Sequence, residues 1–252
     1  MMKKLLVIGI GAGNPDYITM QAVNALNQVD VFFLMDKGQS KDKLIDLRRE
    51  ICDRYITDRT YRFIEAPSPE RERGDVDYKT SVDDLNLAKQ MTFERLINEE
   101  MTDEQCAGFL VWGDPALYDS TIRILQAILA SGRCVFEFEV IPGITSVQAL
   151  AAQHKVPLNR IGRSIEITTG RRLAAGLVSD ADSLVVMLDA EDSYHQVADR
   201  ETQIYWGAYL GTPDEILISG KLGEVADEIE RVRKAARLAN GWIMDTYLLR
   251  KP

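Results

Sequence analysis

Short apolar runs alternate with segments of helical periodicity through the first 140 residues. Each run has the length of a strand, and the expected strands are residues 5–10, 31–35, 61–65, 107–111 and 134–140. Runs that are largely apolar are typical of strands buried on both faces of a sheet. Because helical segments separate the runs, the pattern predicts a mainly parallel sheet in an α/β fold.

The pattern changes after residue 144, where the expected strands become shorter. They are residues 164–168, 183–188, 202–209, 215–219 and 242–249, with a long helix at 222–238. This half is predicted to be a smaller domain with a mixed sheet. No low-complexity linker separates the halves, so the boundary is placed near Pro142. The expected domains are an N-terminal α/β domain, 1–141, and a C-terminal α/β domain, 142–252, joined by a tight hinge.

One charged stretch interrupts the N-terminal pattern. Residues 66–79 contain two prolines, a glycine and many charged side chains, which is typical of a loop. Ser81 is followed three residues later by Asp84, an arrangement that resembles a capping box. A helix is therefore predicted from Ser81 to about Glu100.

Composition limits the classes of partner. The formal net charge is −9, from 39 acidic and 30 basic residues, and this charge repels nucleic acid and anionic lipid. An anionic substrate would need a local basic patch. The three cysteines lack the spacing of metal ligands, so no metal site is expected and reduced thiols in the cytoplasm are predicted. The apolar run at the N-terminus ends after Ile10, too early for a signal peptide or a membrane span.

A glycine cluster follows the first expected strand. Gly9, Gly11 and Gly13 give G-x-G-x-G, and Asn14 stands where the dinucleotide fingerprint needs its third glycine. A nicotinamide oxidoreductase is therefore excluded. Glycines at a strand end let backbone N–H groups approach a ligand, but they also serve plain strand-to-helix turns.

Two more turns close later strands. Gly113-Asp114-Pro115 ends one, and the Asp114 carboxylate is suited either to a ribose hydroxyl or ammonium group of a ligand or to capping the turn. Pro142-Gly143-Ile144-Thr145-Ser146 ends another and places two hydroxyls at the start of a helix, where they bind a ligand or act as an N-cap.

The three turns, in this order, resemble the signature of the tetrapyrrole methylases. The resemblance implies that S-adenosylmethionine binds in a cleft between the two α/β domains and that the protein is a homodimer. The residues implied to bind this cofactor are Gly9, Gly11, Gly13, Trp112, Gly113, Asp114, Leu117, Thr145, Ser146 and Leu188.

Further segments resemble family members of cobalamin synthesis; they are Asp36-Lys37-Gly38, Leu158-Asn159-Arg160-Ile161-Gly162 and residues 167–173. The resemblance implies a corrinoid acceptor, precorrin-5, that is methylated at C-1 with release of acetate. Deacetylation consumes water and benefits from a base and an oxyanion donor, for which Asp114, Tyr118 and Asp36 are the candidates, in that order. The alternative is that all three residues only bind or position the substrate, because the ring itself is reactive. The sequence departs from the family at Ala12, commonly proline, and at Met187-Leu188, often tyrosine-methionine.

Basic residues suited to substrate carboxylates follow the expected strand 164–168. Arg171 and Arg172 offer forked donors, whereas Arg48 and Arg49 have a weaker claim. His195 is expected to be a surface side chain more than a general base.

Two other functions stay open. One is methylation of a different carbon or of a non-tetrapyrrole acceptor, and the other is a catalytically silent module that binds S-adenosylmethionine or a partner.

Overall fold

The computed structural model describes residues 2–36, 42–69 and 78–252, and the side chains of all of these except 36, 42–43 and 78–83. The chain divides into two compact units. The first contains residues 1–11 and 15–144, and the second contains residues 12–14 and 145–252. The boundary expected from the sequence lies after residue 141, and no local pattern indicates that Ala12–Asn14 join the second unit.

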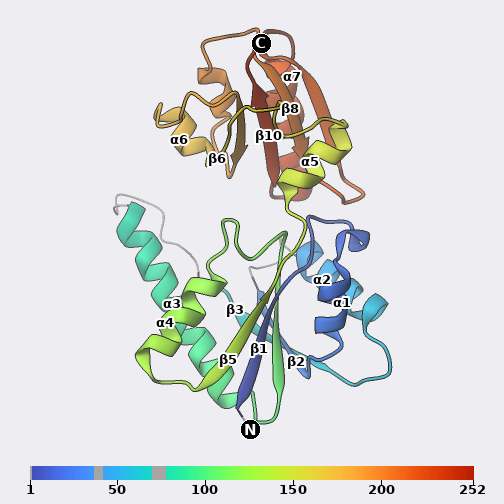
Figure 1. The fold of residues 1–252 in the computed structure, drawn as a ribbon, viewed down its shortest axis with the longest axis vertical. Coiled ribbons are helices and arrows are strands. Elements are labelled where there is room, and N and C mark those ends of the chain that lie inside the picture. Colours follow the sequence, from blue (N-terminus) through green and yellow to red (C-terminus); the bar gives the residue numbers. More distant parts are fainter. Residues whose placement is uncertain (1, 37–41, 70–77) are drawn as a thin grey trace. The chain divides into compact units, whose positions relative to one another are not determined.

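The first unit contains a parallel five-stranded sheet, drawn in Figure 1. Its order is β3-β2-β4-β1-β5, and every neighbouring pair is parallel. The strands are β1 (Lys3–Gly9), β2 (Val31–Asp36), β3 (Arg62–Pro67), β4 (Cys106–Val111) and β5 (Phe136–Ile141). All five expected strands are thus present, and the prediction of a parallel sheet is confirmed.

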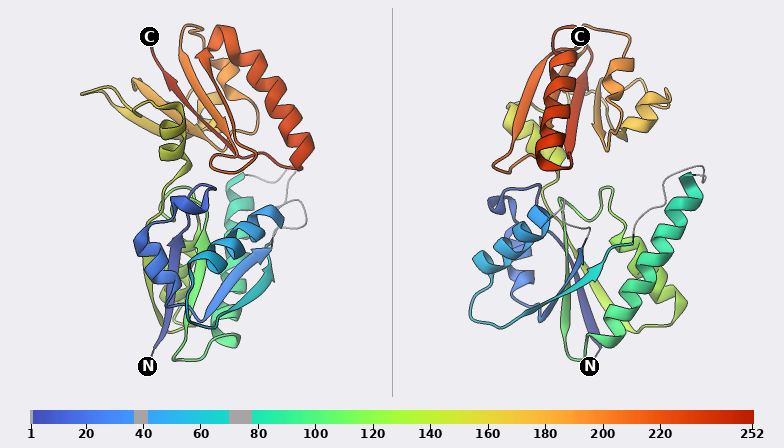
Figure 2. Two further views of the ribbon diagram at one scale, coloured as in Figure 1. Left: turned by 90° about the vertical axis from the view of Figure 1, so that its right-hand side faces the viewer. Right: turned by 180° about the vertical axis from the view of Figure 1, so that it is seen from behind.

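Helices cover both faces of this sheet, as Figures 1 and 2 show. On one face lie α1 (Met20–Leu26) and α2 (Asp42–Tyr55), whose apolar side chains pack with one cluster of buried residues. On the other lie α3 (Tyr78–Glu99) and α4 (Thr121–Ser131), packed against a second cluster. Apolar residues point to both faces of the strands β1 to β4, which are buried between two helical layers. The edge strand β5 differs, because Glu137 and Glu139 are exposed on one of its faces.

The start of α3 differs from the expectation. The helix begins at Tyr78, so Ser81 lies inside it and the predicted capping box is wrong. Several polar residues precede this helix, and the local pattern does not distinguish which of them begins it. Of the predicted loop 66–79, residues 70–77 lie outside the described residues.

The second unit contains a mixed sheet of order β6-β7-β10-β8-β9. Its strands are β6 (Ile165–Thr169), β7 (Ser183–Met187), β8 (Gln203–Ala208), β9 (Ile216–Lys221) and β10 (Asp245–Arg250). Only β6 and β7 pair in parallel. The mixed sheet predicted for this half is therefore confirmed.

Three further helices and two 3-10 turns are found in the described part of the chain. In the second unit α5 (Ser146–His154) and α7 (Leu222–Asn240) pack on opposite faces of the sheet (Figure 2), and α6 (Gly170–Ala174) follows β6. The turns are η1 (Pro15–Tyr17) in the first unit and η3 (Ser193–Gln196) beside α7. Within the described ranges, no helix has the length and apolarity needed to cross a membrane.

Candidate functional site

Three glycines meet where β1, β4 and β5 end. A Cβ atom placed on Gly143 would lie 2.1 Å from the carbonyl oxygen of Gly113, and one on Gly9 would lie 2.6 Å from the amide nitrogen of Gly143. Real side chains do not approach backbone atoms so closely, so only glycine fits at these positions. The three sequence turns therefore form one junction of closely packed backbone, here named the glycine junction (Gly9, Gly113 and Gly143).

Backbone hydrogen bonds tie the junction together. The amide of Gly11 donates to the carbonyl of Gly113 over 3.3 Å, and the amide of Gly113 donates to the carbonyl of Gly11 over 2.8 Å. This reciprocal pair continues the contact between β1 and β4 beyond the ends of both strands. These bonds hold the turns after β1 and β4 together at the carboxyl edge of the sheet, where open α/β sheets bind ligands.

Asp114 joins the turn after β4 to the turn after β5. Its carboxylate accepts hydrogen bonds from the amides of Gly143, at 2.8 Å, and Ala116, at 2.7 Å. One oxygen is used for each bond, so the carboxylate acts first as a structural link within the junction. The capping interpretation of Asp114 in the sequence describes this arrangement well.

The other predicted residues of this turn lie beside Asp114. The indole N–H of Trp112 is buried and has no hydrogen-bond partner among the described residues. Such an orphaned donor is costly unless a ligand or water satisfies it. The amide of Leu117 donates to the carbonyl of Asp114 and closes the turn. Tyr118 has a left-handed backbone, with φ +52°, and its side chain is 47% exposed.

Four predicted cofactor residues belong to the second unit: Gly13, Thr145, Ser146 and Leu188. Gly13 packs against the backbone there, since a Cβ atom would lie 2.3 Å from the carbonyl oxygen of Leu210. Thr145 is the N-cap of α5 and forms a capping box with Gln148, so its hydroxyl serves the helix. The hydroxyl of Ser146 lies 3.4 Å from that of Thr246.

Leu188 directly follows β7 and is held in an uncommon conformation. Its φ is +53°, and its side chain is 65% exposed. A left-handed backbone is unfavourable for a residue with a Cβ atom and persists only where the surroundings fix it. The next residue, Asp189, is buried and accepts bonds from the Tyr247 hydroxyl, at 2.7 Å, and from the amide and hydroxyl of Ser193. These bonds anchor the turn that carries Leu188.

The Asp189 carboxylate also touches the turn after β6. A Cβ atom on Gly170 would lie 2.3 Å from its Oδ1 atom, so this position requires glycine. Thr169, next to Gly170, has a buried hydroxyl without a partner among the described residues. Its neighbour in the β6–β7 register is Met187, so Thr169 lies near Leu188. The sequence analysis did not select Thr169, and only the β6–β7 register reveals its position.

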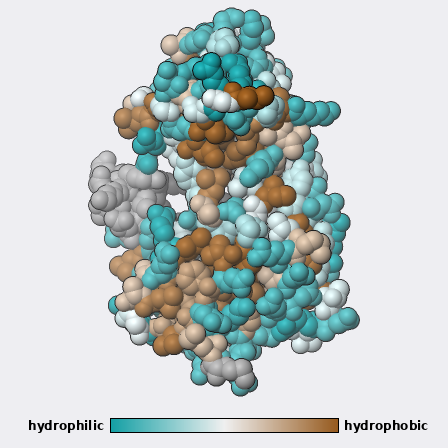
Figure 3. Space-filling view, viewed as in Figure 1, coloured by the Kyte–Doolittle hydropathy of each residue, from teal (hydrophilic) through white to brown (hydrophobic). Residues whose placement is uncertain are grey.

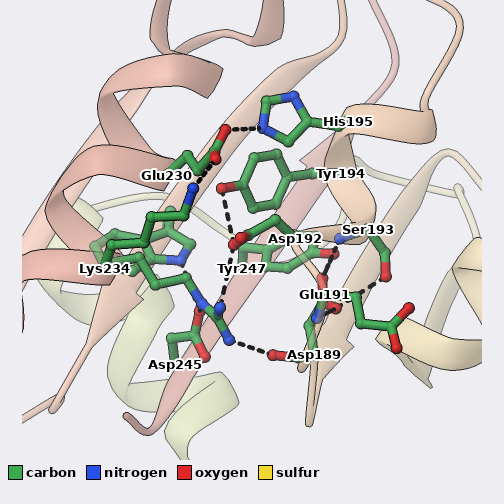
Figure 4. A network of polar contacts seen from close by, with 12 residues as sticks. Asp189, Glu191, Asp192, Ser193, Tyr194, His195, Glu230, Lys234, Asp245 and Tyr247 are labelled. Atoms are coloured by element: carbon green, nitrogen blue, oxygen red, sulfur yellow. Dashed lines mark hydrogen bonds and ion pairs between the residues drawn. The ribbon is translucent and has the colours of Figure 1, made fainter. Parts of the chain in front are cut away.

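A network of buried charges lies beneath these turns (Figure 4). Arg233 from α7 is 5% exposed and pairs with Asp245, at 2.9 Å, and Asp192, at 3.3 Å. The indole of Trp206 also donates to Asp245. Burial raises the pKa of Asp245, whereas Arg233 lowers it. For Arg233 burial opposes the charge, but Asp245 and Asp192 raise its pKa and keep it cationic. No local sequence pattern indicates this network.

The predicted substrate arginines start α6. Arg171 and Arg172 are both exposed, and Arg172 donates to the carbonyl of Leu177, at 2.7 Å, just beyond the same helix. The pKa of Glu166 is lowered mainly by hydrogen bonds from Ser179, and Arg172 contributes to the shift. Arg172 therefore has local structural partners in addition to any role in binding.

His195 occupies the surface position that the sequence favours. Its ring forms a pair with Glu230, at 3.1 Å, and Glu230 also binds Lys234 (Figure 4). The carboxylate of Glu230 is thus shared between α7 and η3. No substrate-facing geometry distinguishes His195 among the described residues.

The cysteines and acidic residues carry no sign of metal chemistry within the described ranges. The three cysteines are buried and free, and burial raises the pKa of Cys52 to about 12 and that of Cys106 to about 11, so both stay protonated at neutral pH. No three His, Cys, Asp or Glu side chains of the described part gather as metal ligands. Asp36 ends β2, but its side chain lies outside the described residues.

Comparisons with known proteins extend over nearly the whole chain. The model of the family described as Tetrapyrrole (Corrin/Porphyrin) Methylases matches residues 4–226. A precorrin-6A synthase [deacetylating] from Sinorhizobium sp is 52% identical over 250 residues, which covers 99% of this chain and 96% of the relative. A cobalt-precorrin-2 C(20)-methyltransferase from Salmonella typhimurium is 27% identical over 74% of this chain and 73% of the relative.

Solved structures give the same fold. A cobalamin synthesis related protein from Corynebacterium diphtheriae has a TM-score of 0.83 and 35% identity and covers 99% of both chains. A uroporphyrin-III C-methyl transferase from Thermus thermophilus, complexed with S-adenosyl homocysteine, has a TM-score of 0.62 and 16% identity and covers 98% of this chain and 97% of that one.

Proposed function

Because this chain belongs to the tetrapyrrole (corrin/porphyrin) methylase family, we propose that it methylates precorrin-5 at C-1 and releases acetate, giving precorrin-6A. The observation that carries the proposal is the 52% identity, over 99% of the chain, with a relative that bears this activity in its name. The C(20)-methyltransferase shares only 27% identity over 74% of the chain. A different methylation position is therefore the less supported function.

S-adenosylmethionine would supply an electrophilic methyl group. The residues of the first unit fit such a molecule, because the glycine junction brings three strand ends together without side chains and Trp112 offers a buried N–H donor that has no partner among the described residues. We propose that the turns after β1, β4 and β5 hold the cofactor, and Leu188 stays a proposed cofactor contact. Methyl transfer to carbon then depends on alignment and exclusion of water.

Deacetylation sets a separate requirement. Water must add to the acyl carbon, so a base and a donor to the developing oxyanion would lower the barrier. Asp114 already accepts two backbone hydrogen bonds, and we assign it the holding of the turns. Tyr118 has an exposed side chain beside them, and we propose its hydroxyl as the oxyanion donor. Asp36 stays a candidate base, and Arg171 and Arg172 stay proposed contacts for substrate carboxylates.

The test of this function follows label and acetate separately. We expect enzyme incubated anaerobically with methyl-labelled S-adenosylmethionine and precorrin-5 to place one label in the ring and to release one acetate per turnover. Label without acetate would reduce the function to simple methylation. If neither product forms while the cofactor still binds, the acceptor is a different molecule.

We also propose that the protein is a cytoplasmic homodimer. On the face seen in Figure 3, hydrophobic residues gather in patches on each unit, and large apolar side chains such as Ile161, Ile165 and Leu177 are exposed. Exposed apolar patches are typical of interaction surfaces. Light scattering is expected to give twice the 28.4 kDa of one chain. A mass of one chain across micromolar concentrations would refute the dimer.

A further inference from the structure

Leu188 lies between two residues that the second unit holds in place. Met187 ends β7 and pairs with both neighbouring strands, β6 and β10. Asp189 is buried, and its main-chain carbonyl accepts a hydrogen bond from the guanidinium of Arg233 on α7. A backbone with a φ of +53° persists only where the surrounding structure fixes it. The left-handed conformation of Leu188 is therefore imposed by its two neighbours.

The carboxylate of Asp189 is the centre of this anchor (Figure 4). One oxygen accepts hydrogen bonds from the Tyr247 hydroxyl and the Ser193 amide, each at 2.7 Å. The other accepts from the Ser193 hydroxyl, at 2.8 Å, and from the Glu191 amide, at 3.1 Å. Burial raises the pKa of Tyr247 well above its ordinary value, and Asp189 adds to the shift, so the hydroxyl keeps its proton and donates. Asp189 thus joins the turn after β7 to β10 and η3.

The same carboxylate packs against the turn after β6. A Cβ atom on Gly170 would lie 2.3 Å from the Oδ1 atom of Asp189 and 2.6 Å from its Cβ atom. The two turns therefore touch at Asp189 with no room for a further side chain. Gly170 begins α6, which also contains the proposed substrate contacts Arg171 and Arg172. Asp189 consequently fixes the turn that carries Leu188 against the turn that leads to these arginines.

The side chain of Leu188 is 65% exposed, so its own packing does not hold it in place. Strained backbone of this kind is concentrated at active sites and ligand-binding turns. We propose that Asp189 is a positioning residue, whose carboxylate holds Leu188 in the left-handed conformation in which the leucine contacts S-adenosylmethionine. This inference rests on the proposed function for the identity of the cofactor. Asp189 acts through the turn, and it does not touch the cofactor itself.

The test measures the affinity for S-adenosylhomocysteine by calorimetry and the unfolding midpoint in urea. Asp189→Ala removes all four hydrogen bonds of the carboxylate, which leaves Leu188 free to take ordinary backbone conformations. Because the binding conformation is then populated only in part, the affinity should fall about ten-fold or more. Tyr247→Phe removes one of the four bonds and keeps the ring, so a smaller loss of about three-fold is expected.

A double-mutant cycle separates positioning from a general loss of structure. Leu188→Ala removes the proposed contact itself, so adding Asp189→Ala to it should change the affinity by less than about two-fold. If Asp189→Ala does not fold, Tyr247→Phe takes its place in the cycle.

Asp189→Asn is the conservative variant. Its amide oxygen can accept from the Tyr247 hydroxyl and the Ser193 amide, and its NH2 group can donate to the Ser193 hydroxyl. Only the bond from the Glu191 amide is lost. Most of the affinity lost in Asp189→Ala should therefore return in Asp189→Asn.

A matched control lies at the other end of β7. Asp182 directly precedes the strand, and its side chain is 15% exposed and pairs with Arg160, at 3.2 Å. Asp182→Ala removes a carboxylate of low exposure without altering the turn that carries Leu188. It should lower the unfolding midpoint but leave the affinity for S-adenosylhomocysteine within about two-fold, because distant sites act independently.

Two results would overturn the positioning role. One is an affinity for S-adenosylhomocysteine in folded Asp189→Ala and Tyr247→Phe equal to that of the unmodified protein. The other is a loss of affinity on Asp189→Ala that is equally large when residue 188 is already alanine, which would indicate a structural role unrelated to Leu188. Failure of the proposed function is distinguishable, because it appears as absent turnover of precorrin-5 by the unmodified enzyme, whereas these affinities are measured without a corrinoid.

Discussion

Replacing Arg233 with methionine is expected to lower the free energy of unfolding by about 3–5 kcal/mol at neutral pH. The substitution keeps an unbranched side chain of moderate length but removes the cation that Asp245 and Asp192 share. Among the described residues, Asp245 is then left as a buried carboxylate with the indole of Trp206 as its remaining side-chain donor. Urea unfolding followed by circular dichroism measures the change.

The deficit of this variant should depend on pH with a defined sign. Burial raises the pKa of Asp245, and loss of Arg233 removes the charge that lowers it. A carboxyl group whose pKa is raised in the folded state binds a proton more readily there than in the unfolded chain. Such a group therefore contributes stability at pH values below its pKa in the unfolded chain, about 3.9, and this contribution is lost as the pH rises through its pKa in the folded protein. The difference between Arg233→Met and the unmodified protein should shrink as the pH falls.

A matched control lies one residue further along α7. Lys234 carries the same charge but is exposed and pairs with Glu230 at the surface. Lys234→Met should leave the unfolding midpoint nearly unchanged, because exposed ion pairs contribute little. A midpoint in Arg233→Met equal to that in Lys234→Met would contradict the assigned role of the buried network.

The substitution Gly143→Ala is expected to abolish detectable turnover, with a loss of about 100-fold or more. The new methyl group would lie 2.1 Å from the carbonyl oxygen of Gly113 and 2.8 Å from the carbonyl carbon of Gly9. Backbone on all sides prevents a small local adjustment, so the turns after β1, β4 and β5 must move apart, and misplacement of about 1 Å has effects of this size on catalysis. Overpacking should also cost about 1–3 kcal/mol of stability.

Calorimetry with S-adenosylhomocysteine separates these two effects. The unmodified protein should bind about one ligand per chain, and folded Gly143→Ala should bind it far more weakly. Gly223→Ala is the control, since a Cβ atom there meets its nearest neighbour, the Arg200 carbonyl oxygen, at 3.4 Å, an ordinary contact. Unchanged affinity in folded Gly143→Ala would remove the glycine junction from the cofactor site.

The two expected effects arise from different physical origins. Gly143 acts through excluded volume at the carboxyl edge of the parallel sheet, whereas Arg233 acts through compensation of buried charge in the mixed sheet. The first should reduce binding in a protein that still folds, and the second should reduce folding itself. The Gly143→Ala variant therefore tests the first unit, and the Arg233→Met variant tests the second.

The sequence by itself determined the class of fold and the three turns. Unbroken apolar runs and the helices between them specify a parallel sheet through local periodicity, and the parallel sheet and the mixed sheet are both found. Glycines at strand ends and the family resemblance also pointed to Gly9, Gly113 and Gly143 without knowledge of their contacts. Periodicity and strand-end glycines depend only on residues that are neighbours in the chain, so they can be recognised in a single sequence.

Only the tertiary structure decided which side chains meet. Asp114 is read in the sequence as ligand-binding or capping, and it becomes a link to Gly143 because β4 and β5 flank β1. Arg48 reaches the carbonyl of Leu110, 62 residues away in the chain, where β2 and β4 no longer pair beyond Phe33 and Phe109. Asp189 and Arg233 lie 44 residues apart in the chain, yet they are hydrogen-bonded. Such contacts depend on strand order and register, and the periodicity of one segment contains no information about the partner it will find.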